Sequence, residues 1–523
     1  MPERFRLTED NRKWWTLGAM CFALFMIMLD NTVVNVALPS IQRSLHTSLS
    51  NLEWTVNAYT LTFGVLLVTG GRAGDIFGRR RMFLFGVMLF AASSAAIGLA
   101  PSDAFLIAGR AVQGIGAAFM MPGTLSIISN TFPPHERGRA IGTWAGVSAL
   151  ALALGPVVGG ALTQYVSWRA IFYINVPVAA AAVAVTLFAT HESRDETIDR
   201  TVDYAGIATL SVGLTALILA LVESASWGWG STKIIGLLAV AVIGLAAFVF
   251  VELKVAKAPM VQFEFFKSRT FFGANVIAFI VSFAMLAMFF LTALYIQNIL
   301  GYSPLQAGIR FLPTTLMIVL IAPISGRLAD RIGPRLPMTV GLALTAVSLF
   351  LQTRITVSSG YTDLLAPFVL MGVGMALVMS PMSTAAMNAV PATKAGVASG
   401  ILSMNRMVGG TFGVALLGTI FQTLSRNQLK HNLASMPLSP GQKSAIADNI
   451  GQSSSGSHAA SPQIVNAAHD AFIHGFTGAM TFSAAVAAAG SLLAFALIQP
   501  LVKRAPEAAT AQAAEATAEP VGV

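Results

Sequence analysis

The sequence predicts an all-α membrane protein of fourteen transmembrane helices. We expect two six-helix halves, two further helices inserted between them, and both termini in the cytoplasm. Three observations lead to this fold class: the apolar composition, the placement of Lys and Arg, and an internal repeat. Of the 523 residues, 55% are hydrophobic and only 11% are charged, whereas a soluble globular chain carries about a quarter charged residues.

The apolar residues gather into runs that are long enough to cross a bilayer. A helix of about 20 apolar residues spans the hydrocarbon core, because lipid offers no partner to an open backbone. The first run is too long for the apolar core of a signal peptide and is expected to remain as the first span. The fourteen runs lie near 15–38, 54–71, 82–100, 104–130, 139–164, 168–190, 204–223, 232–253, 271–299, 305–327, 337–356, 363–388, 395–422 and 475–500.

These runs divide the chain into four regions. Residues 1–190 are expected to form the first six-helix half, and 191–270 the inserted helices 7 and 8 with cytoplasmic linkers. Residues 271–500 form the second half, which includes a Ser-, Asn- and Gln-rich extracytoplasmic loop at 423–474. Residues 501–523, rich in Ala, Glu and Thr, are expected to be a disordered cytoplasmic tail.

The basic residues set the orientation of the spans. With the N-terminus inside, 22 of the 32 Lys and Arg residues fall on cytoplasmic segments, as the positive-inside rule requires. The same scatter over many loops excludes nucleic acid as a partner, despite a net charge of +9. The single cysteine, Cys21, excludes an intrachain disulfide.

An internal repeat relates the two halves. The segment from Gly71 to Arg80 returns 255 residues later as Gly326 to Arg335, with five of ten positions identical, and a second set of matching glycines follows at an offset of 258. Helices 2–5 therefore correspond to helices 10–13, and helices 7 and 8 are inserted between the halves.

The segment after helix 2 is a candidate latch. Glycines permit a tight turn and close helix approach, and a carboxylate beside arginines can hold two helices in one state and release them in another. The alternative is a loop that is basic only because it faces the cytoplasm, but the return of the pattern around Asp330 favours the latch. Its candidate residues are Gly71, Asp75, Gly78, Arg79, Arg80 and Asp330.

Asp30 is the only carboxylate predicted to lie deep in a helix. An ionisable residue within the membrane is costly and is a candidate for function. Loss of water favours the protonated form of a carboxyl group, so Asp30 is the candidate proton site. The alternative is a structural ion pair that never titrates. Arg110 of helix 4 lies at a similar depth, roughly 9–12 Å below the outer surface, and could meet Asp30.

Other polar and small residues mark a central region. The helix 5 run with Gly155, Pro156, Gly159 and Gly160 combines close packing with a bend, which suits a rocking interface, although an ordinary glycine-rich packing face is an equal reading. Arg406 lies near the midplane, beside Asn405. Residues that could line a cavity are Asn35, Asn57, Tyr59, Gln113, Asn405 and Arg406, and each could instead serve helix packing.

These segments resemble the signature motifs of the major facilitator superfamily. The 71–81 segment resembles the motif between helices 2 and 3, although Ala73 and Ile76 replace a usual Leu and a usual Arg. The run from Leu106 to Ala118 resembles the helix 4 motif in full. The resemblance implies the major facilitator fold and a proton-transfer role for Arg110.

Further motifs resemble one subfamily. The run Gly155–Gly160 resembles the antiporter motif of exporters, with Ala151 where glycine is common. Leu29–Pro39 resembles the helix 1 motif of the fourteen-helix drug:proton antiporters, and Trp168–Pro177 is also similar to that family.

The resemblance implies a proton-coupled exporter of small amphipathic drugs, antibiotics or toxic metabolites. It would be a multi-pass protein of the cell membrane, expected as a monomer, with the proton gradient as energy source and no cofactor or metal. The alternatives are a proton-coupled nutrient or metabolite importer on the same fold and a membrane receptor. An enzyme is not expected, because no phosphate loop, metal-ligand spacing or nucleophile constellation is present.

The second half departs from some exporters of lipophilic cations, which carry additional membrane carboxylates there. This chain has no such carboxylate and has Arg406 instead. The sequence therefore predicts a preference for neutral, zwitterionic or anionic amphiphiles over multivalent cations.

Overall fold

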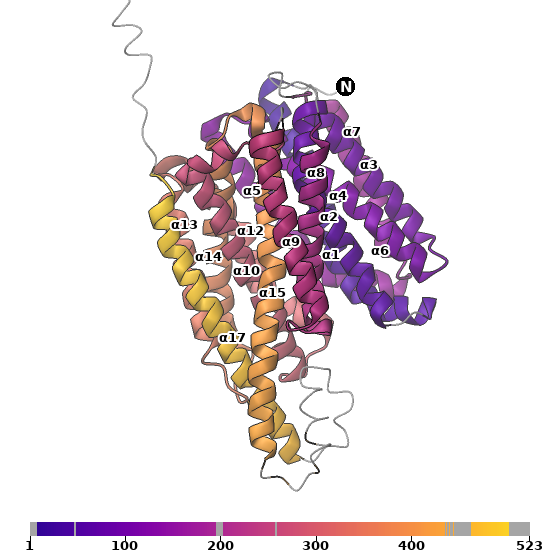
Figure 1. Cartoon of the computed structure of the whole chain (residues 1–523), viewed down its shortest axis with the longest axis vertical. Coiled ribbons are helices and arrows are strands. Elements are labelled where there is room, and N and C mark those ends of the chain that lie inside the picture. The colour runs from indigo at the N-terminus through magenta and orange to yellow at the C-terminus, as the bar shows by residue number, and fades with distance from the viewer. Residues whose placement is uncertain are drawn as a thin grey trace, which may run out of the picture.

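The computed structural model describes residues 8–46, 49–194, 202–256, 259–434, 436, 439, 443 and 462–500. Over these residues the regular structure is helical, and the long helices run side by side along one axis (Figure 1). In chain order they are α1 (Glu9–Leu45), α2 (Leu49–Phe77), α3 (Arg79–Gly98), α4 (Asp103–Thr131), α5 (Pro134–Tyr165), α6 (Ala170–Tyr173), α7 (Asn175–Ala189), α8 (Tyr204–Trp227), α9 (Thr232–Phe250), η2 (Val251–Val255), η3 (Phe263–Lys267), α10 (Arg269–Asn298), α11 (Pro304–Arg310), α12 (Leu312–Ile332), α13 (Arg335–Gln352), α14 (Thr362–Asn388), η4 (Ala392–Lys394), α15 (Ala395–Leu433) and α17 (Pro462–Leu497).

Twelve helical segments of the described chain are long and apolar enough to cross a membrane. The prediction of an all-helical membrane protein is confirmed to that extent. Two further helices, α2 and α5, have 29 and 32 residues and pack inside the bundle. The main neighbours of α2 are α4 and α15, and those of α5 are α12 and α1.

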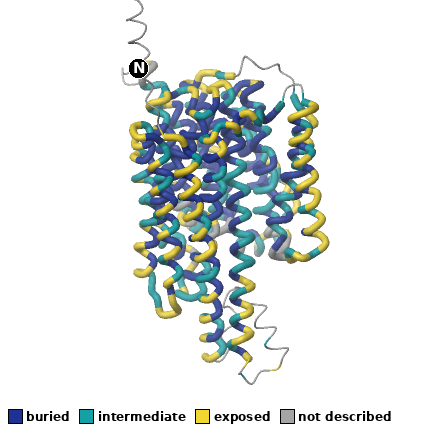
Figure 2. Tube along the Cα trace, turned by 60° about the vertical axis from the view of Figure 1, so that its left-hand side comes forward, coloured by how far each residue is buried: buried dark blue, intermediate teal, exposed yellow. Residues whose placement is uncertain are grey.

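The outer surface of the bundle is apolar, as a protein surrounded by lipid requires. Figure 2 shows the buried residues concentrated inside the bundle and the exposed ones along its sides. Large hydrophobic side chains are among the exposed ones, including Leu99, Val242, Ile243 and Leu492. A water-soluble surface would not carry so many of them.

Several helices extend beyond the predicted apolar runs. The first helix begins at Glu9 rather than near 15, because Thr8 caps it: the Thr8 side chain accepts from the backbone N–H of Asn11, and the Asn11 side chain accepts from the N–H of Thr8. This capping box starts the helix before the apolar run.

Helices extend into both ends of the predicted loop at 423–474. Helix α15 continues to Leu433 and α17 begins at Pro462, and the two project together beyond the other helices (Figure 1). These extensions bury only one face, through Leu429, Leu433, Ala467 and Ala471. A continuous apolar run is absent there, so the apolar pattern does not predict these extensions.

Two predicted helices are interrupted. The run 168–190 divides into α6 and α7, and the run 305–327 into α11 and α12. In both cases a proline, Pro177 or Pro313, lies in the first turn of the second helix. Proline cannot donate to the preceding turn and clashes with it, so the helix restarts.

The inserted helices α8 and α9 form a hairpin at the side of the bundle. They approach closely where Gly213 faces Gly244, and α8 also contacts α2 and α15. The indole N–H of Trp229 donates to Thr419 Oγ1 at 2.6 Å, which ties the turn of this hairpin to α15.

Helices α1, α3, α5, α13 and α15 all begin at one end of the bundle. We call this end the basic end. Arg12, Lys13, Arg79, Arg139 and Arg335 lie there. The ends of α2 and α12, which carry Asp75 and Asp330, lie there as well.

Candidate functional site

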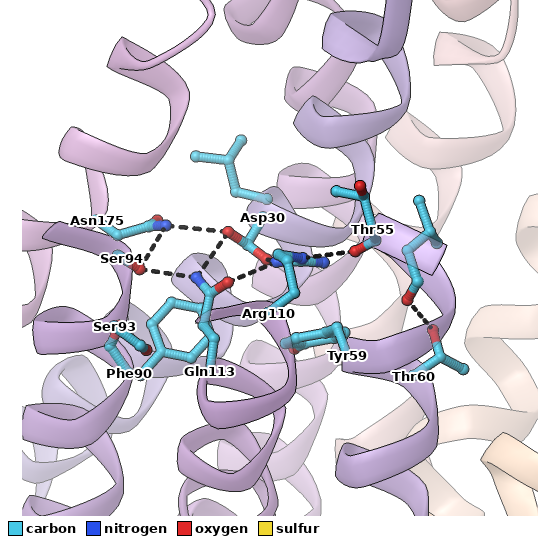
Figure 3. Close-up of polar contacts among 12 residues, drawn as sticks. Asp30, Thr55, Tyr59, Thr60, Phe90, Ser93, Ser94, Arg110, Gln113 and Asn175 are labelled. Atoms are coloured by element: carbon cyan, nitrogen blue, oxygen red, sulfur yellow. Dashed lines mark hydrogen bonds and ion pairs between the residues drawn. The ribbon is translucent and has the colours of Figure 1, made fainter. Parts of the chain in front are cut away.

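Asp30 lies in the interior of α1 and has no exposed surface. Arg110 of α4 is 1% exposed, and its Nη1 donates to Asp30 Oδ2 at 2.5 Å (Figure 3). The structure thus brings together the two charged residues that the sequence placed at similar depth. They form a buried ion pair between α1 and α4.

The remaining contacts of Arg110 fix its orientation. Its Nε donates to the carbonyl oxygen of Thr55 on α2 at 3.0 Å, and Nη1 donates to Gln113 Oε1 at 2.6 Å. The guanidinium carbon lies 4.2 Å from the centre of the Tyr59 ring, which adds a cation–π contact. Arg110 and Gln113 are one helical turn apart, so both face α1.

The other oxygen of Asp30 is held by two amides. Oδ1 accepts from Gln113 Nε2 at 3.0 Å and from Asn175 Nδ2 at 3.1 Å. Ser94 Oγ accepts from the same two groups, at 2.7 Å and 3.3 Å. The network therefore joins α1, α3, α4 and α7 (Figure 3).

Two members of this network were missed as site residues. Ser94 was not singled out, and Asn175 entered only as part of a resemblance. Their signals were weak: a serine pair, Ser93 and Ser94, interrupts the apolar run of α3, and Asn175 lies at the break before α7. Both are buried neutral polar residues, and buried polar groups need hydrogen-bond partners.

The site holds one carboxylate charge against one guanidinium in the interior of the bundle. Asp30 receives one hydrogen bond from a guanidinium and two from amides. A proton on Asp30 would cancel its charge and leave the buried Arg110 uncompensated, and breaking such a pair costs about 3–5 kcal/mol. Protonation would thus change the free energy of holding α4 against α1.

The helix 5 run packs beside this network. A Cβ on Gly155 would overlap the Thr32 side chain of α1, and a Cβ on Gly159 would lie 2.7 Å from Val33 Cγ1. Gly160 is half-buried, and the side chain of Pro156 lies outside the described residues. The run therefore seats α5 on α1 close to Asp30.

The contact of α5 with α12 uses other glycines. A Cβ on Gly142 would overlap the carbonyl oxygen of Ala322, and one on Gly138 would overlap that of Gly326. The close contact of α5 with α12 thus lies nearer the basic end than the Gly155–Gly160 run.

At the basic end, Asp75 of α2 is completely buried and joins α2 to α15. Oδ1 accepts from the backbone N–H of Gly396 at 3.0 Å, and Oδ2 accepts from that of Val397 at 2.8 Å. These N–H groups belong to the first turn of α15, where a helix favours an anion. Asp75 also binds Arg79 at 2.6 Å.

Arg79 extends the same contact. It is 1% exposed, and its Nη2 donates to the carbonyl oxygens of Ala392 at 3.1 Å and Thr393 at 2.6 Å. Gly71 lets the helices meet, because a Cβ there would overlap the carbonyl oxygen of Gly396. Predicted latch residues Gly71, Asp75 and Arg79 thus lie at one α2–α15 contact.

Gly78 and Arg80 lie apart from that contact. Gly78 has φ +108°, a conformation that favours glycine, and it turns the chain from α2 into α3. The backbone N–H of Arg80 donates to Glu192 at 3.0 Å, and its Nη2 donates to the carbonyl oxygen of Leu187 at 3.1 Å. Arg80 therefore binds the segment at and after α7 rather than α15. Glu192, missed in the sequence, accepts from the first turn of α3.

Asp330 makes the equivalent contact from α12. Its Oδ1 accepts from the backbone N–H of Gly138 on α5 at 3.2 Å. Nearby, Ser380 of α14 donates to the carbonyl oxygen of Gly138 at 3.1 Å. The repeat thus places one carboxylate from each copy near the start of a helix in the other part of the chain.

The residues predicted to line a cavity lie in different parts of the bundle. Tyr59 and Gln113 belong to the Asp30 network, and Asn57 is half-buried. Asn405 donates to Asn275 of α10 at 3.1 Å, while Arg406 follows it on α15. The side chain of Asn35 lies outside the described residues.

A hollow of about 360 Å³ opens at the basic end between the α2–α4 helices and α8. Ala73 and Ile76, the two departures from the family motif, both line it. Its walls are apolar, from side chains such as Phe77, Phe85 and Phe119. Ile76, where an arginine is usual, thus helps to make this hollow apolar, and Ala73 is smaller than the usual leucine.

Comparisons with known proteins agree with this architecture. The sequence profile of the Major Facilitator Superfamily matches residues 20–414. The tetracenomycin C resistance and export protein of Streptomyces glaucescens is 36% identical over 493 residues, covering 92% of this chain and 91% of that one. The multidrug resistance protein Stp of Mycobacterium tuberculosis is 37% identical over 436 residues, covering 83% and 81%.

A solved structure shares the fold at low sequence identity. The proton:xylose symporter XylE superposes with a TM-score of 0.61 at 11% identity, covering 94% of this chain and 97% of that one. At this identity the likeness concerns the fold alone.

Proposed function

Because this chain belongs to the major facilitator superfamily, a family of multi-pass transporters of the plasma membrane, we propose that it is a proton-coupled exporter of small amphipathic drugs, antibiotics or toxic metabolites. The observation that carries the proton coupling is the buried Asp30–Arg110 pair with its amide donors. The export direction is supported by relatives that are named as resistance and export proteins.

The proposal includes a topology of fourteen spans. Helices α2 and α5 join the twelve apolar segments, while α6 with α7 and α11 with α12 each act as one span. The basic end faces the cytoplasm, following the positive-inside rule, so both termini lie inside. Residues 1–190 and 271–500 are the two moving halves and 191–270 the inserted pair, while the predicted tail at 501–523 lies outside the described residues.

Alternating access supplies the mechanism. The basic end is joined by the contacts of Asp75 with α15 and of Asp330 with α5, which we assign to a state closed toward the cytoplasm. A proton from outside binds Asp30, weakens its pair with Arg110 and shifts α1 against α4. The halves then rock about a central site, the latches open, and substrate enters from the cytoplasm or the inner leaflet.

The substrate class follows from charge. In the second half, none of the carboxylates that the structure describes is buried, and Arg406 lies deep in α15. A multivalent cation would therefore find no counter-charge in the second half. We propose a preference for neutral, zwitterionic or anionic amphiphiles; good transport of a dicationic dye, with none of neutral or acidic antibiotics, would refute it.

Import is the second candidate, because a symporter shares this fold. The two directions differ in cellular accumulation. An exporter lowers the intracellular concentration of its substrate while the proton gradient is intact, and an importer raises it. Collapse of the gradient with an uncoupler reverses either effect.

Substitution of Asp30 tests the proton coupling. A resistance profile of an efflux-deficient host first selects a compound that the protein exports. In proteoliposomes with an imposed pH gradient, we expect Asp30→Asn to abolish both the transport of that compound and the proton movement it drives, because the variant binds no proton at this site.

The matched control is Asp470→Asn, the same change at an exposed carboxylate of α17, which should transport normally. Equal insertion and melting temperature of the two variants would separate lost coupling from misfolding. Normal gradient-driven transport by Asp30→Asn would remove Asp30 from the proposed role.

A further inference from the structure

Arg406 lies deep within the bundle. It follows the start of α15 at Ala395 by eleven residues, which is about 16 Å along the helix. The residues on either side have neighbours on different helices: Asn405 donates to Asn275 of α10, and Met407 lies against Gly64 of α2. The turn that carries Arg406 is thus enclosed between α10 and α2.

The charge of Arg406 has no partner among the residues that the structure describes. No hydrogen bond or ion pair with any of them reaches its guanidinium, and its Nε is buried without an acceptor. An arginine stays charged in proteins, and a charge inside the membrane is costly unless it is paired. Among the described residues, none therefore supplies a counter-charge or a hydrogen-bond acceptor for the Arg406 guanidinium.

The other deep arginines differ in this respect. Arg110 binds a carboxylate, an amide oxygen and a backbone carbonyl. Arg79 binds Asp75 and two backbone carbonyls. Both guanidinium groups thus have a carboxylate and carbonyl oxygens as partners within the protein, and Arg406 is the exception among these three arginines of the described interior.

We propose that Arg406 is the subsite for an acidic group of the transported molecule, a carboxylate or sulfonate; this rests on the proposed export function and narrows its substrate class. A guanidinium binds such a group through two parallel hydrogen bonds. Half-buried Met404 and Met407 on the same stretch of α15 provide an adaptable apolar surface for the rest of an amphiphile.

The subsite is separate from the proton site. Along α2, Thr55 contacts Arg110 and Gly64 contacts Met407, nine residues or about 13 Å apart. The charge of Arg110 is already balanced by Asp30. An anion and a proton can therefore be bound at different places.

A matched pair of probes tests the proposal with the full-length protein. One probe is 1-anilinonaphthalene-8-sulfonate, and the other is its uncharged analogue N-phenyl-1-naphthylamine. Equilibrium dialysis against the purified protein, with empty micelles subtracted, gives both dissociation constants. We expect the sulfonate to bind the wild type at least about tenfold more tightly, the effect of roughly one charge-assisted hydrogen bond.

Three variants make the result specific. Arg406→Gln should lose the preference for the sulfonate while it still binds the neutral probe, and Arg406→Lys should keep part of the preference. Arg354→Gln, the same change at an exposed arginine at the end of α13, should keep all of it. Because Arg406 has no described partner, Arg406→Gln should melt no lower than the wild type.

Two results would overturn the assignment: a wild type that binds the sulfonate no more tightly than the neutral probe, or a preference that survives in Arg406→Gln. Binding is measured here without a proton gradient. A lost preference with intact Asp30-dependent export would refute the subsite alone. An anion preference without gradient-driven export would refute the proposed function and leave the subsite standing.

Discussion

Asp75 and Asp330 occupy equivalent positions of the repeat, and the two contacts they make differ in strength. Asp75 is completely buried, binds Arg79, and accepts from the backbone N–H groups of Gly396 and Val397. Asp330 is half-buried and accepts from the backbone N–H groups of Gly138 and Arg139, and no ion pair reaches it from the described residues. One contact is a saturated charge network, while the other is a carboxylate near a helix start.

The difference traces to one position. Arg79 follows Asp75 by four residues, and the residue four after Asp330 is Pro334. The glycines are retained in both copies: Gly71 faces Gly396, and Gly326 faces Gly138. Close helix crossing is therefore a property of both copies, whereas the arginine that locks the crossing belongs to one. We expect the α5–α12 contact to open more easily than the α2–α15 contact.

The largest expected effect comes from removing the two carboxylates one at a time. Asp75→Asn leaves Arg79 buried without its counter-charge, and removing one partner of a buried pair costs about 3–5 kcal/mol. Asp330→Asn loses a carboxylate near a helix N-terminus, worth about 1 kcal/mol. The first variant should shift most molecules away from the closed basic end, and the second only a minority.

Pulsed electron paramagnetic resonance across the basic end measures this shift. Spin labels at Arg81 on α3 and Leu336 on α13 occupy exposed sites, and the buried Cys21 is first replaced so that it cannot be labelled. The long-distance population should rise strongly in Asp75→Asn and slightly in Asp330→Asn. Equal populations in the two variants would contradict the comparison.

An intermediate effect is expected from the glycines, where the two copies are alike. A Cβ in Gly71→Ala or Gly326→Ala would overlap a backbone carbonyl oxygen across the crossing, and overpacking of this kind costs about 1–3 kcal/mol. Both should open the basic end to a similar degree in the same spectroscopic measurement. Gly74→Ala is the control, because its Cβ would lie 3.8 Å from Arg79, an ordinary contact. A large effect in only one of the two crossings would show that the glycines are not equivalent.

In the Asp30 network, the sequence predicted the charged residues better than the neutral polar ones. Asp30 and Arg110 could be paired by depth, because charges are rare inside spans and each must find a partner. Ser94 and Asn175 could not, because a small polar residue in an apolar helix is as often a packing residue. Arg80 was grouped with the latch by its place in the motif, but the turn at Gly78 directs it toward Leu187 and Glu192. The turn at Gly78 sets the direction of the Arg80 side chain, and the motif does not specify that turn.

Helix ends were predicted less well than helix existence, for a similar reason. Apolar runs mark what is surrounded by lipid, so they do not predict the projecting ends of α15 and α17, which bury only one face through Leu429 and Ala471. The start of α1 depends on the Thr8 cap, a local hydrogen-bond pattern rather than an apolar one. Capping and one-sided packing therefore explain these three displaced boundaries.

The smallest expected effect is a gain, from Pro334→Arg, which supplies the arginine that the second copy lacks. Pro334 has φ −76° and ψ −22°, a helical conformation that any residue adopts without strain. An arginine four residues after Asp330 could pair with it, and at a half-buried site such a pair contributes about 0.3–1 kcal/mol. The closed population should therefore rise slightly.

Pro334→Ala separates this gain from the loss of proline, which changes the unfolded chain as well. The gain should also vanish when Pro334→Arg is combined with Asp330→Asn, because the guanidinium then has no carboxylate to bind. If Pro334→Arg and Pro334→Ala gave the same distance distribution, the missing arginine would not explain the weaker contact. The cause would then have to be sought in the partial exposure of Asp330 itself.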